Sequence, residues 1–236
     1  MLYQPTVFIS HPFKTQIFFP GVSAEGSLKF EPNNLKNTIE IGSKKMGFGQ
    51  LVIPNLTHSS DVHHLKAASF EDASNIVADS VIVDTPRVAV AITHADCQST
   101  VIYDPRQKRF AAIHAGWRGL FKNIYSHTID KMLSLGSRAE DLLVFLGPSL
   151  GLEHSAFENF KDEVPKEYHA NMVLPYHFDL KTIAREQFLS LGLLDQNIEI
   201  SPVCTAENTN FCSYRRSKKQ NGSLSARNFT ICGILL

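Results

Sequence analysis

The chain has 236 residues, with 23 basic and 23 acidic side chains and a formal net charge of zero. This balance gives no reason to expect nucleic acid or an anionic membrane as the main partner. No segment approaches the ~18 consecutive apolar residues of a transmembrane helix, and residues 1–5 lack the basic start of a signal peptide. The four cysteines show no paired short spacing, which argues against a disulfide framework and favours a reducing cytoplasm.

The first third of the chain predicts short strands and one helix. The expected strands are 6–10, 15–19, 50–54 and, less regularly, 62–66. Residues 32–46 are expected to form a helix that Gly47 ends.

The rest of the chain combines buried strands with two amphipathic helices. Strands are expected at 80–83, 88–93, 99–103, 110–114, 142–146 and 228–235. The continuous apolar run 88–92 is typical of a strand buried on both faces. Helices are expected at 119–135, ended by Gly136, and at 179–191, capped by Asp179. Because strands and helices do not alternate strictly, we expect one layered α/β (α+β) domain over 1–236 rather than a simple doubly wound sheet.

Two short motifs concentrate the residue types of a reactive site. One is Ala95-Asp96-Cys97 at the end of a strand, and the other is the hexapeptide 114–119, which begins with His114. A third candidate, His58, lies upstream in a polar turn. Two histidines and one cysteine are the ligands of a zinc site with one open position. A cysteine nucleophile with a histidine base uses the same residues, so the pattern leaves both readings open.

Arginines near these motifs are candidates for anion binding. Arg118 lies near the start of a predicted helix, where backbone N–H groups and the helix dipole favour anions. Arg215 and Arg216 are adjacent and flanked by aromatic residues, a pattern that suits phosphate binding or stacking and equally suits a solvated basic turn.

Taken together, the segments resemble the laccase-domain family, also called polyphenol oxidase or multicopper polyphenol oxidase-like, whose members are regarded as purine nucleoside phosphorylases. The matching pieces are His58, 61–62, 95–97, the full 114–119 hexapeptide, 146–151, 204–205, 213–216 and Arg227. The hexapeptide is highly specific, and the pieces cover most of the chain from about residue 50 onward.

The resemblance implies an α/β domain with sheets packed between helices, similar to the α/β/β/α sandwich of cysteine-hydrolase-like proteins. It implies a zinc-type ion, with copper as the alternative metal, held by residues matching His58, Cys97 and His114. It also implies phosphorolysis of adenosine, inosine and methylthioadenosine, with adenosine deamination as a further activity. We expect a monomer or homodimer.

Each candidate residue has an expected role. Catalytic roles are expected of His58, Cys97, His114 and Asp96, with Asp96 tuning a ligand or binding substrate. Substrate and phosphate binding is expected of Arg118, Arg215, Arg216 and Arg227.

The sequence departs from the family pattern at four positions: Gln16, Leu56, Ser59 and Ser99 stand where relatives usually have Arg, Gln, Gly and Pro. Three other functions stay in view. A Cys97/His114 cysteine hydrolase needs no metal. A degenerate relative would bind a nucleotide or partner without catalysis. Copper polyphenol oxidation is the least favoured, because the ten histidines include no His-x-His pair.

Overall fold

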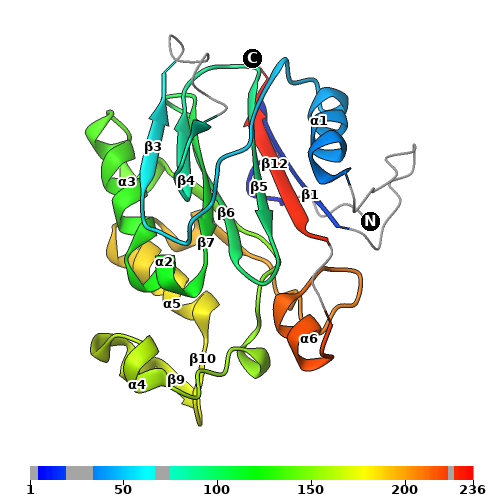
Figure 1. Ribbon diagram of the computed structural model, residues 1–236. Helices are drawn as coiled ribbons and strands as arrows, with labels where there is room; N and C mark the ends of the chain where they lie inside the picture. Colours follow the sequence, from blue (N-terminus) through cyan, green and yellow to red (C-terminus); the bar gives the residue numbers. More distant parts are fainter. Residues whose placement is uncertain (1–4, 20–33, 67–74, 223–225, 236) are drawn as a thin grey trace.

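Two mixed β-sheets lie face to face in the computed structural model, which describes residues 5–19, 34–66, 75–222 and 226–235. The larger sheet has the order β11 (Ile198–Ile200), β8 (Leu143–Leu146), β6 (Gln98–Asp104), β7 (Arg109–Ala115), β4 (Ser80–Val83), β3 (Val62–Leu65). The smaller has the order β1 (Phe13–Phe18), β12 (Asn228–Ile234), β5 (Val88–His94), β2 (Gln50–Val52). Helices cover the two outer faces (Figure 1), so the layers run α/β/β/α.

Alternating side chains of the larger sheet serve two cores. On β4, Val81 and Val83 pack in the core between the sheets, whereas Ile82 packs in the core beneath the helices, as the period of two along a strand requires. The helices over this sheet are α2 (Trp117–Phe121), α3 (Ile124–Ser134) and α5 (Leu180–Ser190). Both faces of the sheet are therefore covered, and every residue of its central strands β6 and β7 is buried.

A single helix, α1 (Leu35–Lys45), covers the smaller sheet, and Ile39 packs there against β5 and β12. Further short elements are α4 (Phe160–Glu163), α6 (Tyr214–Lys219) and the hairpin of β9 (Met172–Leu174) with β10 (His177–Phe178). Two of the longer helices have side-chain caps: Asn34 accepts from Asn37 N in α1, and Asp179 accepts from Lys181 N in α5.

The layered α/β class with sheets between helices is confirmed, as are most of the expected strands. The expected strand 6–10 is wrong: it forms turns, and the Glu199 carboxylate accepts from the backbone N–H groups of Thr6 and Val7. The expected helix 119–135 is two helices, because Asn123 adopts a left-handed conformation with φ 59° between them. The start of the expected helix 32–46 lies partly outside the described residues, and α4, α6 and the β9–β10 hairpin were not predicted.

The described helices include none that is both long and apolar enough to cross a membrane.

Candidate functional site

Strand register brings Cys97 and His114 together. Strands β6 and β7 are antiparallel neighbours, with Ser99 paired to His114 and Gln98 paired to Ala115. The start of β6 therefore lies beside the end of β7, and Cys97 comes opposite Gly116. Two motifs seventeen residues apart in the sequence thus form one side of a site.

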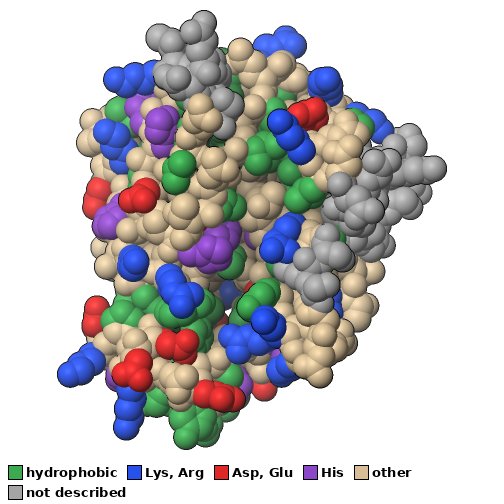
Figure 2. Space-filling view, in the orientation of Figure 1, with side chains coloured by type: hydrophobic (Ala, Val, Ile, Leu, Met, Phe, Trp, Pro, Cys, Tyr) green, Lys and Arg blue, Asp and Glu red, His purple; other side chains and the backbone are tan. Residues whose placement is uncertain are grey.

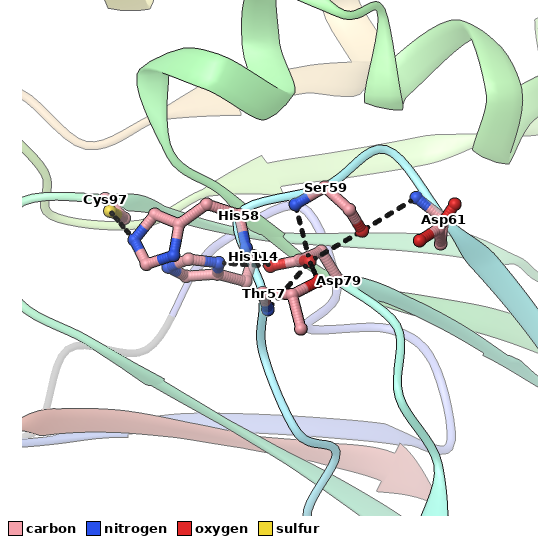
Figure 3. A network of polar contacts seen from close by, with 7 residues as sticks. All are labelled: Thr57, His58, Ser59, Asp61, Asp79, Cys97 and His114. Atoms are coloured by element: carbon pink, nitrogen blue, oxygen red, sulfur yellow. Dashed lines mark hydrogen bonds and ion pairs between the residues drawn. The ribbon is translucent and has the colours of Figure 1, made fainter.

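His58 reaches this site from the loop between β2 and β3. Its backbone has a positive φ of 59°, which is costly for a residue with a side chain and needs support from its surroundings. The Asp79 carboxylate supplies that support, because it accepts hydrogen bonds from the backbone N–H groups of Thr57, His58 and Ser59 (Figure 3). The imidazole of His58 then packs edge-on against that of His114, with ring centroids 4.8 Å apart.

Asp79 is the organising residue of the site, and sequence reasoning missed it. It is fully buried immediately before β4, and besides the three N–H groups it accepts from the hydroxyls of Thr57 and Ser59. It also bonds His114 Nδ1 at 2.8 Å. The available signal was a carboxylate at the start of an apolar strand, since a buried charge needs partners.

The three predicted ligand side chains converge. The ligand atoms of His58, Cys97 and His114 all lie within 4.8 Å of one another, and Cys97 Sγ is 3.8 Å from His58 Nε2. Zinc bonds of about 2.3 Å to sulfur and about 2.0 Å to nitrogen place tetrahedral S and N ligands about 3.6 Å apart. Because Asp79 occupies Nδ1 of His114, the ring presents Nε2 as its ligand atom. The donor set and its spacing fit a zinc-type ion.

The electrostatics of the cluster favour a charged pair. Burial raises the pKa of the Cys97 thiol, but His114 and His58 lower it by a larger amount. The resulting pKa is about 7, below the ordinary value for cysteine. Burial lowers the pKa of His114, but Asp79 and Cys97 raise it to about 9. Burial raises the pKa of Asp79, yet its bonds to His114, Ser59 and Thr57 hold that pKa well below the ordinary range. A cysteine pKa lowered in this way suits a nucleophilic or metal-binding thiol better than an inert core residue.

A cavity of about 770 Å³ opens over the cluster, and Cys97, His58 and His114 all line it. Figure 2 shows histidine, lysine and arginine side chains around a hollow in the middle of this face. Much of the wall is apolar or aromatic, contributed by Leu56, Leu120, Leu150, Leu180, Trp117, Phe157 and Tyr214. An apolar wall with a few convergent polar groups is the usual form of a small-molecule site.

Four cationic side chains line the same cavity: Arg118, Arg215, Lys218 and Arg227. The Arg118 guanidinium lies 4.0 Å from the ring centroid of Trp117, and Arg215 Nη1 donates to the Ala156 carbonyl. Lys218 was not among the predicted residues. Arg216 is not among the lining residues, because its guanidinium donates to the loop carbonyls of Thr205, Ala206, Asn208 and Phe211.

Asp96 lines the cavity, but its hydrogen bonds to Thr205 and Arg215 lead away from the His–Cys cluster. One carboxylate oxygen accepts from the Thr205 hydroxyl at 2.7 Å, and the other accepts from the backbone N–H of Arg215 at 2.6 Å. Asp96 thereby fixes the start of α6, the helix that carries Arg215 and Lys218 into the cavity wall.

The four departures from the family pattern occupy different places. Leu56 lines the cavity, and Ser59 adds its hydroxyl to the donors around Asp79. Ser99 lies in β6 opposite His114, and its buried hydroxyl has no hydrogen-bond partner among the described residues. Gln16 lies in β1, opposite Ile231 of β12.

His94 makes the stability of the fold sensitive to acid. It lines the cavity, is 2% exposed, and burial followed by the charge of His114 lowers its pKa to about 3. Since the unfolded chain takes up a proton near pH 6.5 and the folded chain does not, stability falls as pH drops from about 6.5 toward 3. The slope from this residue is at most about 1.4 kcal/mol per pH unit.

The His94→Gln variant is expected to show a flatter decline in its free energy of unfolding between pH 7.5 and pH 5, measured by urea denaturation. Parallel curves for the variant and the parent protein would contradict this origin of acid sensitivity.

The four-layer fold is that of the YfiH/YlmD-type structures. YlmD from Geobacillus stearothermophilus superposes with a TM-score of 0.80 at 20% identity, covering 98% of this chain and 94% of that chain. A Neisseria meningitidis protein superposes with a TM-score of 0.78 at 22% identity, covering 99% and 98%. At these identities the likeness shows the fold alone.

The chain belongs to the multi-copper polyphenol oxidoreductase laccase family, whose model matches residues 27–227. A purine nucleoside phosphorylase of Synechocystis sp. is 35% identical over 173 residues, which are 62% of this chain and 66% of that protein. A purine nucleoside phosphorylase of Deinococcus radiodurans is 27% identical over 243 residues, covering 96% of this chain and 91% of that protein. A third, from Bacteroides thetaiotaomicron, is 29% identical over 192 residues, covering 74% and 71%.

Proposed function

We propose that the protein is a zinc-dependent purine nucleoside phosphorylase that acts on adenosine, inosine and methylthioadenosine. The observation that carries this proposal is the cavity, which combines a His2Cys cluster, aromatic walls and four cationic side chains. Relatives named purine nucleoside phosphorylase support the same reaction class. Its partners are then a purine nucleoside and phosphate, with a monomer or homodimer in the cytoplasm as the working form.

In the proposed reaction, a phosphate oxygen attacks the anomeric carbon of the ribose as the bond to the purine nitrogen breaks. The purine leaves with the proton that the hydrogen phosphate gives up, and the ribose keeps the phosphate as a sugar 1-phosphate. Arg118, Arg215 and Arg227 suit the phosphate, because a guanidinium presents paired donors to an oxyanion. Trp117 and Phe157 offer aromatic faces and edges to the purine ring.

His58, Cys97 and His114 would hold the zinc ion, with Asp79 fixing His114 and the His58 loop. A zinc ion bound there supplies a positive charge that polarises substrate oxygens. Copper is the alternative metal. We also propose adenosine deamination as a side activity, in which water replaces the amino group and ammonia leaves.

A cysteine hydrolase is the second candidate, and one specific observation favours it. Asp79, His114 and Cys97 form an orienting carboxylate, a base and a low-pKa thiol, which is the arrangement of a cysteine nucleophile. In that reaction the thiolate attacks an acyl carbon, and His114 gives its proton to the leaving group. This chemistry proceeds without a metal, so chelation separates the two candidates.

The test is an incubation of zinc-loaded protein with adenosine, with and without phosphate, followed by chromatography of the products. Adenine that forms only with phosphate is the expected result, and inosine would register the deamination. If neither product appears from adenosine, inosine or methylthioadenosine, the phosphorylase proposal fails and the hydrolase or a binding role takes its place.

A further inference from the structure

A second group of metal-ligating side chains lies outside the cluster already described. It consists of His154, Cys204 and Glu207, whose ligand atoms all lie within 4.8 Å of one another. His154 Nε2 is 3.5 Å from Glu207 Oε1. Two tetrahedral zinc ligands of this kind, with bonds of about 2.0–2.1 Å, lie about 3.3 Å apart, so the pair is already close to a shared-ion geometry.

The environment of Cys204 suits a bound thiolate. Its sulfur is buried and accepts a hydrogen bond from the backbone N–H of Gly151 at 3.2 Å. An N–H donor to sulfur stabilises the negative charge of a thiolate and fixes its direction. The sulfur of Cys204 is thus aimed at the turn that carries His154, the η4 segment Leu152–His154.

The backbone around the three residues is fixed before any ion binds. Cys204 pairs with Ser149 in an isolated bridge, and Thr205 N donates to the Ser149 carbonyl at 3.0 Å. On one side of Cys204, Lys181 Nζ donates to the carbonyls of Ser201 and Val203. On the other side, the Arg216 guanidinium holds the carbonyls of the 205–211 loop. A site that is held in place this way loses little entropy when it binds a ligand.

Burial is graded across the group, from the buried Cys204 through the half-buried His154 to the exposed Glu207. This order gives an ion a path from solvent and leaves a position on the Glu207 side for water as a fourth ligand. Sulfur, nitrogen and carboxylate oxygen together match zinc better than magnesium or calcium, which take oxygen ligands.

We propose that His154, Cys204 and Glu207 form a second zinc site, which clamps the 150–154 turn to the 204–208 loop. Leu150 at the start of that turn lines the main cavity, and the loop is bonded to Asp96 through Thr205. The second ion therefore supports the cavity wall without touching the His58–Cys97–His114 cluster. This proposal does not depend on the reaction proposed above.

The test measures how many equivalents of zinc the protein binds. A chelator first removes any metal, and the protein is then brought to equilibrium by dialysis at micromolar free zinc. The wild-type chain is expected to bind two equivalents, and a His58→Ala, Cys97→Ser double variant is expected to bind one. Adding Cys204→Ser to that double variant is expected to remove the remaining equivalent. Cys212→Ser is the matched control. Cys212 is a free, half-buried cysteine, and it belongs to neither group of candidate metal ligands found among the described residues. This control should leave two equivalents.

Two further measurements keep the test decisive. In the His58→Ala, Cys97→Ser background, added Co²⁺ is expected to give a thiolate-to-cobalt absorption band that Cys204→Ser abolishes. Should Cys204→Ser fail to fold, the pair His154→Gln, Glu207→Gln, which changes one half-buried and one exposed side chain, is expected to weaken binding of the second equivalent about 10–100-fold. The second site would be overturned if the wild type bound one equivalent of zinc and the His58→Ala, Cys97→Ser variant bound none. That result would leave the first site intact.

Discussion

Replacement of Asp79 by asparagine is expected to lower zinc affinity 10–100-fold and to destabilise the fold by about 3 kcal/mol. The carboxylate accepts six hydrogen bonds, from Thr57 N, Thr57 Oγ1, His58 N, Ser59 N, Ser59 Oγ and His114 Nδ1. An amide group replaces one accepting oxygen by a donor, so buried N–H groups are left facing another donor. The positive φ of His58 then loses its support, and His114 loses the partner that orients it.

Zinc titration and urea denaturation of Asp79→Asn check both effects. Asp61→Asn is the matched control, because Asp61 is an exposed carboxylate of the same loop whose side chain does not contact the cluster in Figure 3. The control should keep full zinc affinity and stability. Normal zinc affinity in Asp79→Asn would show that the loop and His114 hold their positions without the carboxylate.

Alanine at Gly116 is expected to disable the site while leaving the fold in place. A Cβ at this position would lie 2.8 Å from Cδ2 of His58 and 3.4 Å from Sγ of Cys97. The first distance is too short, so the His58 ring must move away from its partners. A ligand displaced by about 1 Å is expected to reduce the catalytic rate by about 100-fold and to weaken zinc binding strongly.

Zinc content and turnover of Gly116→Ala are compared with those of Gly49→Ala. At Gly49 the added Cβ would meet, among the described residues, only the Arg87 carbonyl, at 3.9 Å, and the backbone φ is not positive. Gly49→Ala should therefore match the parent protein in both readouts. Equal zinc binding by Gly116→Ala and the parent would remove His58 from the proposed ligand set.

The buried strands and the closeness of Cys97 to His114 could be predicted, because both depend on patterns within short stretches of the sequence. Apolar runs such as 88–92 mark buried strands whatever the rest of the chain does. The motifs containing Cys97 and His114 adjoin consecutive strands joined by a short turn, and antiparallel pairing then brings them side by side.

The role of Asp79 could not be predicted, because it depends on a loop more than twenty residues away folding back over the carboxylate. Likewise, the segment 6–10 has strand-like residues, but the backbone N–H groups of Thr6 and Val7 donate to the Glu199 carboxylate instead of to a neighbouring strand. Arg216 looks like Arg215 in sequence, yet only tertiary structure shows that its donors are used by the 205–211 loop. The break at Asn123 had a signal, since asparagine tolerates the left-handed conformation.

If the His58–Cys97–His114 cluster is a zinc site for phosphorolysis, the release of adenine must require the metal. The most direct measurement follows phosphate-dependent release of adenine from adenosine by three samples: zinc-loaded protein, chelator-stripped protein and stripped protein given back zinc. Activity is expected to be lost on stripping and restored by zinc, and a Cys97→Ser protein is expected to stay inactive after zinc is added. Full activity in the stripped sample, or in Cys97→Ser with zinc, would contradict this expectation.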